Sequence, residues 1–286
     1  MPDYTTPAGF RAAVEAKLRE WAHRLGVPAY IVRRQAALER LIVRLTKVAP
    51  GRWALKGGMA LETRLGTRAR VSVDLDVDHV HGATAARADL QRATITEMSD
   101  HFGFAVAGSE ELGEAGVGLA VRYTIETSLA GRIFEPVQVD VTIAPPETWD
   151  AQAAQRPGLL AEFGFAPIDV LLVPLDRQIA EKLHAYTRVY QGGGTTRVRD
   201  LVDLLLIREH ETVEANAMQR AIHGVFARRA THAVPNRLPS PARGLAVAYR
   251  REAQRVGITT DLDEAHQRLA EWLDPILAKL QRTPRP

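Results

Sequence analysis

Strand patterns and helix patterns occupy different parts of this sequence, and this separation constrains the fold more than any other feature. Apolar and polar residues alternate along 71–80, and similar patterns mark 119–127 and 135–143, as expected of half-buried strands. From about residue 170 onward, apolar residues instead recur at helical spacing. The chain is therefore predicted to combine an α/β N-terminal half with an all-helical C-terminal half.

Helical patterns also lead the chain, before the first strand signal. Apolar spacing predicts helices over 9–24 and 29–48, and glycine or proline follows each of them. A short strand, Trp53–Leu55, then runs through a Lys-Gly-Gly turn into another helix. Strand signals fade after the Pro-Pro pair at 145–146, so we place the domain boundary beyond it. The predicted domains are residues 1–165, with the two leading helices, and a helical domain, residues 166–286.

The bulk composition is that of an ordinary globular protein. Of the 286 residues, 46% are hydrophobic and 25% are charged, and the net charge is only +3. No apolar run approaches the roughly 18 residues that a membrane span needs, and the N-terminus has no apolar signal core. We therefore expect a cytoplasmic monomer with no membrane partner. The chain has no cysteine, so oxygen or imidazole ligands would have to hold any metal ion.

Two aspartates on the alternating segment are the first candidates for chemistry. Because successive side chains on a strand point to opposite faces, Asp74 and Asp76 project the same way, about 7 Å apart. Converging carboxylates repel each other unless a cation lies between them, and Mg²⁺ prefers carboxylate and phosphate oxygens. Asp140 occupies the polar face of another predicted strand. If the two strands are neighbours, Asp140 completes a three-carboxylate site.

A solvated polar strand face is the plainer interpretation of an Asp-x-Asp pattern. Three observations favour a binding site instead. The aspartates lie in mid-strand, where Asp is disfavoured, a Lys-Gly-Gly turn lies just upstream, and a third strand aspartate follows.

Lys56, Gly57 and Gly58 join the short strand to the following helix. Glycine lets a backbone approach a ligand closely, and the N-terminus of a helix presents free N–H groups to an anion. The turn is therefore a candidate triphosphate cradle, although it matches neither the GxxxxGK[ST] loop nor the GxGxxG turn. Gly-Gly turns are common, and this one gains meaning from the Asp-x-Asp that follows it.

A lysine and an aspartate in the helical half are further candidates. Lys182 falls at the edge of the apolar stripe of the helix that begins near Pro174. It can extend along that stripe to the surface, or it can contact a phosphate at the domain cleft. Asp200 opens the next predicted helix. It can serve as a helix N-terminal charge, pair with Lys182, or act as a base toward an acceptor hydroxyl.

The stretch between residues 215 and 251 contains arginine but no aspartate or glutamate. Such a run is often a solvated basic face, yet a gap of this length is hard to dismiss in a chain with 34 acidic residues. Clustered arginines match phosphate geometry and are typical of nucleic-acid binding. The candidates for RNA contact are Arg220, Arg228, Arg229, Arg237, Arg243, Arg250 and Arg251.

Taken in order, these elements resemble the AbiEii-type nucleotidyltransferase toxins, including the MenT toxins of mycobacteria. The resemblance spans roughly residues 52–208 and depends on the ordered set of motifs rather than on any single one. The matching segments are Leu55–Leu61 (LKGGMAL), Arg70–Asp76 (RVSVDLD), Val139–Val141 (VDV), Gln178–Ala185 (QIAEKLHA) and Arg199–Leu204 (RDLVDL).

The resemblance implies an α+β fold, with a DNA polymerase β-like nucleotidyltransferase core on a mixed sheet and an all-helical C-terminal domain. It implies Mg²⁺, or Mn²⁺, held by Asp74 and Asp76 with Asp140 as a third candidate ligand, and an NTP as substrate. The residues expected to contact the nucleotide are Lys56, Gly57, Gly58, Ser72 and Lys182. The residues expected to act in catalysis are Asp74, Asp76, Lys182 and Asp200. Ser72 is also similar to a serine that a kinase-type antitoxin phosphorylates in one branch of the family, and phosphate there should block triphosphate binding.

The implied function is that of a toxin that transfers a nucleoside monophosphate, most simply a pyrimidine, from an NTP to the 3′ end of tRNA and so blocks translation. Its expected partners are tRNA and a cognate antitoxin encoded nearby. Two other interpretations stay open: nucleotidylation of a protein or small molecule, and a non-catalytic nucleotide-binding module. The arginine stretch favours RNA as the acceptor.

Overall fold

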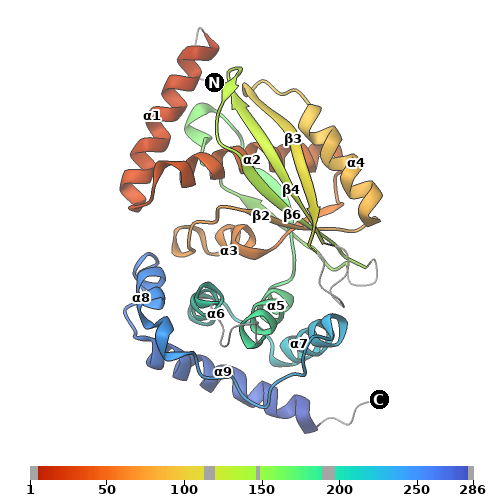
Figure 1. The fold of residues 1–286 in the computed structure, drawn as a ribbon, viewed down its shortest axis with the longest axis vertical. Helices are drawn as coiled ribbons and strands as arrows, with labels where there is room; N and C mark the ends of the chain where they lie inside the picture. The colour runs from red at the N-terminus through yellow and green to blue at the C-terminus, as the bar shows by residue number, and fades with distance from the viewer. Residues whose placement is uncertain (1–5, 113–119, 146–148, 189–196, 283–286) are drawn as a thin grey trace. The chain divides into compact units, whose positions relative to one another are not determined.

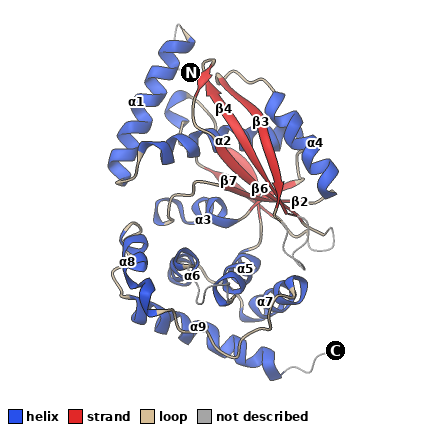
Figure 2. Cartoon of the chain, viewed as in Figure 1, coloured by secondary structure: helices blue, strands red, loops and turns tan. Residues whose placement is uncertain are grey.

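The computed structural model forms two compact units. The residues that it describes are 6–112, 120–145, 149–188 and 197–282. Unit 1 comprises the described residues up to Val173 except Leu65–Arg70, and unit 2 comprises Leu65–Arg70 together with the chain from Pro174 onward. Within the described chain, strands occur only in unit 1 (Figure 2). The predicted α+β fold, a mixed sheet followed by C-terminal helices, is confirmed.

Unit 1 is built on a mixed sheet with the strand order β3-β4-β6-β2-β1-β8-β7, and β5 pairs with β4. The strands are β1 (Trp53–Leu55), β2 (Leu75–His79), β3 (Phe102–Glu111), β4 (Ala120–Leu129), β5 (Arg132–Ile133), β6 (Val137–Ile143), β7 (Gln152–Arg156) and β8 (Ile168–Leu172). The pairs β2–β6 and β1–β8 are parallel, and the others are antiparallel. The strand that carries the Asp-x-Asp pattern, β2, therefore lies inside the sheet between β1 and β6.

The described residues of unit 1 form four α-helices. They are α1 (Pro7–Leu25), α2 (Ala29–Val48), α3 (Gly57–Leu65) and α4 (Gly82–Ile95). Helices α2 and α4 contact each other and the sheet, and α1 packs on α2 (Figure 1). Leu38 and Leu41 of α2 share one buried core with Leu75 and Val77 of β2. The apolar half of the alternating pattern thus anchors the strand, as its period of two predicts.

The aspartate strand is shorter than the sequence predicts. Its pairing with β6 begins at Leu75 opposite Val139, so residues 71–74 precede the ladder. The alternation of Val71 and Val73 does not continue the strand, because Glu62 rather than a neighbouring strand accepts the backbone N–H of Ser72. Asp74 therefore lies in a connecting segment, one residue before β2.

Three strands depart from the sequence-based expectation. Helix α4 ends at Ile95, and β3 follows it in a part of the chain where the sequence shows no strand pattern. Strand signals fade after the Pro-Pro pair at 145–146, yet β7 and β8 form beyond it and pair with each other. Both β3 and β7 are edge strands with mostly exposed residues, so they lack clear apolar alternation. The short apolar run of β8 cannot be distinguished from helix by periodicity alone.

Unit 2 contains α5 (Leu175–Thr187), α6 (Val198–His210), α7 (Ala215–Arg229), α8 (Ala246–Gln254) and α9 (Leu262–Arg282). Helix α6 contacts α5, α8 and α9. It is apolar around most of its circumference, and the whole run from Leu201 to Ile207 is buried, as expected of a central helix. Asp203 lies within that run and is fully buried, so its charge must be compensated nearby. In the part of the chain that the structure describes, none of the helices combines the length and apolarity needed to cross a bilayer.

Candidate active site

In unit 1 the glycine turn packs directly against Asp76. The backbone N–H of Lys56 donates to the carbonyl oxygen of Asp76 at 2.9 Å. Gly57 has a φ of +58°, and a Cβ built on it would lie only 2.0 Å from Oδ2 of Asp76. Any side chain here would therefore strain the backbone and collide with the carboxylate. Gly58 follows, buried in the first turn of α3. The Lys-Gly-Gly turn and Asp76 of the Asp-x-Asp pattern are separate in sequence but are in contact in the fold.

Asp140 lies beside Asp76, because the two residues are Cα partners on the parallel strands β2 and β6. Its carboxylate receives a two-point contact from Arg122 of β4, with Nε–Oδ1 at 2.8 Å and Nη2–Oδ2 at 2.7 Å. The hydrogen bonds that Arg122 donates to Asp140 raise the pKa of the Arg122 guanidinium, and the charge of Asp74 acts in the same direction. Arg122 therefore lies among the carboxylates of the candidate site.

The expected three-carboxylate cluster is not preformed. Among the residues described, no group of three or more Asp, Glu, His or Cys side chains is arranged to hold a metal ion. Asp74 and Asp76 flank Leu75, and both are half-buried. Mg²⁺ is usually bound by one or two carboxylates together with waters and substrate phosphates. This pair therefore fits a divalent cation whose other ligands come from nucleotide and water, and a ligand role for Asp140 stays a prediction.

The side chain of Lys56 points into the protein. It is 8% exposed, and its ammonium lies 2.9 Å from Oδ1 of the fully buried Asp78. It also donates to Oγ1 of Thr142 at 2.6 Å. Since Asp78 and Thr142 are register partners on β2 and β6, Lys56 connects three adjacent strands. A contact between Lys56 and the nucleotide stays a prediction.

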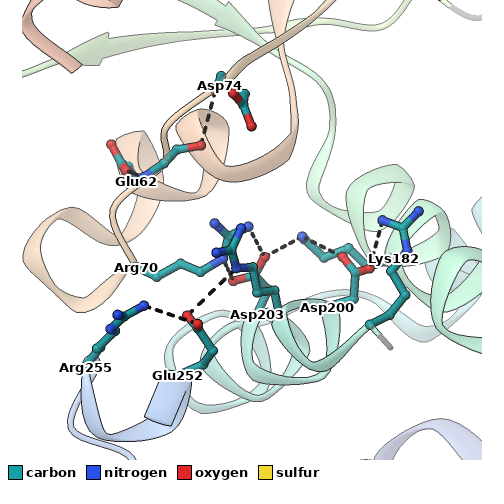
Figure 3. A network of polar contacts seen from close by, with 11 residues as sticks. Glu62, Arg70, Asp74, Lys182, Asp200, Asp203, Glu252 and Arg255 are labelled. Atoms are coloured by element: carbon teal, nitrogen blue, oxygen red, sulfur yellow. Dashed lines mark hydrogen bonds and ion pairs between the residues drawn. The ribbon is translucent and has the colours of Figure 1, made fainter. Parts of the chain in front are cut away.

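Ser72 is buried and belongs to the segment that precedes Asp74. Its backbone N–H donates to the carboxylate of Glu62 on α3, and its hydroxyl donates to the carbonyl oxygen of Asp74 at 3.2 Å. Figure 3 draws Glu62 and Asp74. Nucleotide contact and phosphorylation at Ser72 are not tested by these contacts and stay predictions.

In unit 2, Lys182 and Asp200 meet in a cluster with Asp203 and Arg70 (Figure 3). The Lys182 ammonium lies 2.5 Å from Oδ2 of Asp203 and 3.3 Å from Oδ1 of Asp200. Arg70 contacts both carboxylate oxygens of Asp203 at 3.0 Å. Of the readings open for Asp200, pairing with Lys182 is therefore confirmed. Phosphate contact by Lys182 and catalysis by Asp200 stay predictions.

The opposite charges in this cluster outweigh the effect of burial on the pKa values of Lys182 and Asp203. Burial by itself would lower the pKa of Lys182, but the charges of Asp203 and Asp200 raise it above the usual lysine value. Burial likewise opposes ionisation of Asp203, yet Lys182 and Arg70 hold the pKa of that carboxyl below its ordinary value. The neighbouring charges therefore favour the charged forms of both Lys182 and Asp203.

The arginine stretch is divided between α7, the segment after it, and α8. The exposed members are Arg220, Arg237, Arg250 and Arg251, and the half-buried members are Arg228 and Arg229. The side chain of Arg243 lies outside the described residues. Arg251 is 3.6 Å from Oε1 of Glu252, just beyond the acid-free stretch. RNA contact by these residues stays a prediction.

Sequence reasoning missed Arg122, Glu62 and Arg70. Arg122 contacts Asp140, and Glu62 contacts the backbone of Ser72. Arg70 contacts Asp203, the aspartate that Lys182 also contacts. One sequence does not show any of these pairings. The alternation of β4 was a usable signal for Arg122, since it marks the residue as facing the polar side of a strand. Its partner became identifiable only from the pairing of Arg122 with Asp140 across β4 and β6.

Comparison with known proteins gives one family and several similar folds. The profile of a family described as "Nucleotidyl transferase AbiEii toxin, Type IV TA system" matches residues 40–280. MenT4, a nucleotidyltransferase toxin from Mycobacterium tuberculosis H37Rv, is similar over 92% of this chain and 98% of its own, with a TM-score of 0.56 and 18% identity. At this identity the likeness shows the fold alone.

Two structures from Helicobacter pylori are also similar. A nucleotidyltransferase candidate aligns over 91% of this chain and 100% of its own, with a TM-score of 0.49 and 15% identity. JHP933 aligns over 87% of this chain and 92% of its own, with a TM-score of 0.44 and 19% identity. No curated protein matches the chain in sequence.

Proposed function

The chain belongs to the AbiEii nucleotidyltransferase toxins of type IV toxin–antitoxin systems, as the sequence resemblance predicts, and from this premise we propose that it transfers a nucleoside monophosphate from an NTP to the 3′ end of tRNA. In this proposal the nucleotide is a pyrimidine, and the modified tRNA no longer supports translation. A toxin of this class implies a cognate antitoxin as partner.

The observation that carries the proposal is the contact between the glycine turn and Asp76. The turn opens α3, and the N-terminus of a helix presents backbone N–H groups that suit phosphate oxygens. The carboxylate that lies against Gly57 suits a cation. A triphosphate and the divalent cation that accompanies it can therefore be bound side by side, which is the requirement of nucleotidyl transfer.

The reaction is an in-line displacement. The acceptor 3′-hydroxyl attacks the α-phosphorus, a new oxygen–phosphorus bond forms, the bond to the β-phosphate oxygen breaks, and pyrophosphate and a proton are released. Asp74 and Asp76 would hold Mg²⁺ or Mn²⁺, which when bound neutralises charge on the triphosphate. The glycine turn would orient the nucleotide, and such positioning contributes a large share of the rate.

A polyanionic acceptor is supported by the exposed arginines of unit 2. Arg220, Arg237 and Arg250 are exposed and lie in a stretch without acidic residues. Binding of RNA to such residues releases counterions, so its affinity should fall steeply as salt rises. Such binding weakens strongly over a range on the order of 50 to 200 mM salt. A KM for tRNA that does not change over that range would contradict this part of the proposal.

The direct test is incubation with Mg²⁺, total tRNA and each of the four labelled NTPs. We expect label from CTP or UTP to enter tRNA. Asp76→Asn should reduce transfer by about two orders of magnitude or more, because several kcal/mol of charge stabilisation by the cation is lost. The matched control is Asp169→Asn, which changes an exposed strand aspartate in β8 and should leave the rate unchanged.

Three outcomes would redirect the proposal. Label on protein or on a small molecule would favour nucleotidylation of that acceptor. Tight binding of Mg²⁺ and NTP without transfer to any acceptor would favour a non-catalytic module. Full activity of Asp76→Asn would remove the metal role from β2.

A further inference from the structure

The carboxylate of Glu62 on α3 accepts hydrogen bonds from several different residues. Its side chain is 9% exposed. It accepts hydrogen bonds from Nε2 of Gln35 at 2.8 and 2.9 Å and from Nη2 of Arg156 at 2.8 Å. It also accepts the backbone N–H of Ser72. A carboxylate with this many donors has little rotational freedom, so whatever it binds is fixed in place.

The segment that Glu62 binds lacks the support of a strand ladder. Cα pairing between β2 and β6 begins only at Leu75, so Asp74 and the residues before it precede the sheet pairing. The backbone here is held by the Glu62 contact with the Ser72 N–H and by the hydrogen bond from the Ser72 hydroxyl to the carbonyl oxygen of Asp74. The location of Asp74 therefore depends on a side chain of α3.

We propose that Glu62 is a positioning residue for nucleotidyl transfer: it holds the Ser72–Asp74 segment so that the Asp74 carboxylate is preorganised beside Asp76. The inference rests on the proposed function of this site. It assigns Glu62 no contact with substrate and no part in proton transfer. Residues that orient metal-binding carboxylates from behind commonly contribute about 10–100-fold in metal affinity or activity.

The support of Glu62 continues into the interior of unit 1. Arg156 is 5% exposed, and its Nε donates to Oε1 of Glu39 at 3.2 Å. Oε2 of Glu39 in turn accepts the backbone N–H of Leu159 at 2.7 Å. Arg156 thus lies between two buried carboxylates, one that contacts the Ser72 segment and one that does not. This pair supplies a matched control for the experiment.

A purely structural role would make Glu62 and Glu39 equivalent, since both compensate the same buried guanidinium. The positioning role makes them different, because only Glu62 contacts the segment that carries Asp74. The variants that separate the two roles are Glu62→Leu, which removes the acceptor, Glu62→Gln, whose amide oxygen can still accept from Ser72, and Glu39→Gln, which changes the far side of Arg156.

The kinetic readout is the Mg²⁺ concentration for half-maximal transfer, measured separately from kcat and from the KM for NTP. Glu62→Leu should raise that concentration or lower kcat by about 10-fold or more. Glu62→Gln should restore both to within about 3-fold of the wild type, as a weaker neutral acceptor allows. Glu39→Gln should lower the unfolding midpoint in urea and leave the Mg²⁺ dependence unchanged.

A second readout does not depend on activity. Hydrogen exchange measured by mass spectrometry on a peptide covering residues 71–74 should become about five-fold faster in Glu62→Leu, because the Ser72 N–H loses its acceptor. Exchange should be unchanged in Glu39→Gln. If the wild type transfers no nucleotide, the proposed function fails while exchange still decides the positioning role. Equal exchange and equal Mg²⁺ dependence in Glu62→Leu and Glu39→Gln would overturn the inference.

Discussion

An arginine contacts both carboxylate oxygens of Asp140 in unit 1 and of Asp203 in unit 2, and these two pairs differ in burial. In unit 1, Arg122 and Asp140 have side chains that are 34% and 18% exposed. In unit 2, Arg70 is 16% exposed and Asp203 is fully buried, and Lys182 contacts the same carboxylate. The geometry is similar, but the carboxylate of Asp140 is partly exposed to solvent, whereas that of Asp203 is fully buried.

The difference shows that ionic contacts alone do not distinguish a reactive site from a scaffold. Partly exposed pairs contribute little to stability, and their partners can be exchanged for a ligand at small cost. A buried pair that loses one partner leaves an uncompensated charge in the interior, which costs much more. We therefore interpret the Asp203 cluster as essential to the packing of unit 2, and the Asp140 pair as part of a surface that can reorganise.

Removal of Asp203 should have the largest effect. In Asp203→Ala, Lys182 and Arg70 lose the carboxylate that they share, and Asp200 is the remaining acidic partner of Lys182 within the cluster. The free energy of unfolding should fall by about 3–5 kcal/mol, as for other broken buried pairs. Urea unfolding measures this, with the exposed Asp169→Ala as control. A loss below about 1 kcal/mol, the range typical of surface ion pairs, would show that the cluster contributes as little to stability as the partly exposed Asp140 pair does.

Acid should destabilise unit 2 through His184, a buried group whose contacts with the described residues include no carboxylate. Its side chain is 1% exposed, and burial, reinforced by the charges of Arg229, His232 and Arg188, lowers its pKa to about 3. Its Nε2 lies 2.9 Å from Oγ1 of Thr231. Below about pH 6.5, His184 binds a proton in the unfolded chain but not in the folded chain. Its contribution to the free energy of unfolding is therefore fully present above that pH and is lost as the pH falls.

As pH falls from about 6.5 toward 3, this residue should therefore cost up to roughly 1.4 kcal/mol per pH unit. His184→Gln removes the titration and should flatten the pH dependence of the free energy of unfolding between pH 7 and 5. Urea denaturation at several pH values within that range measures the slope. An unchanged slope in His184→Gln would show that His184 is not the group responsible.

The Arg122 pair should give the smallest effect on stability. Arg122→Gln should change the free energy of unfolding by less than about 1 kcal/mol, because the pair is partly exposed. It should also strengthen Mg²⁺ binding severalfold, since one positive charge beside Asp74 and Asp140 is removed. Calorimetric titration with Mg²⁺ checks the second expectation. Weaker Mg²⁺ binding in Arg122→Gln would contradict the view that Arg122 competes with the cation.

The sequence predicted what depends on local pattern. Alternation identified β2, β4 and β6, helical spacing identified the C-terminal helices, and the ordered motifs indicated the family. The Lys-Gly-Gly turn and the Asp-x-Asp pattern were both recognised in the sequence, whereas the packing of Gly57 against Asp76 is seen only in the structure. Edge strands β3 and β7 lack a buried face, so no alternation marks them clearly.

Partners far apart in sequence could not be predicted in the same way. Arg122 meets Asp140 through the register of two strands, and Glu62 meets Ser72 because the strand begins later than its pattern suggests. Arg70 reaches Asp203 across 133 positions of the chain. Periodicity reports which face a residue occupies, whereas these contacts depend on which faces meet.

The most direct test of the account is the binding of Mn²⁺ in the presence of a non-hydrolysable CTP or UTP analogue, followed by electron paramagnetic resonance. The wild type should bind Mn²⁺ together with the analogue, and Asp74→Asn combined with Asp76→Asn should weaken that binding by at least about 10-fold. The exposed control Asp169→Asn should bind as the wild type does. Mn²⁺ affinity that is unchanged in the double variant would contradict the assignment of a cation to the aspartates of β2 and its preceding segment.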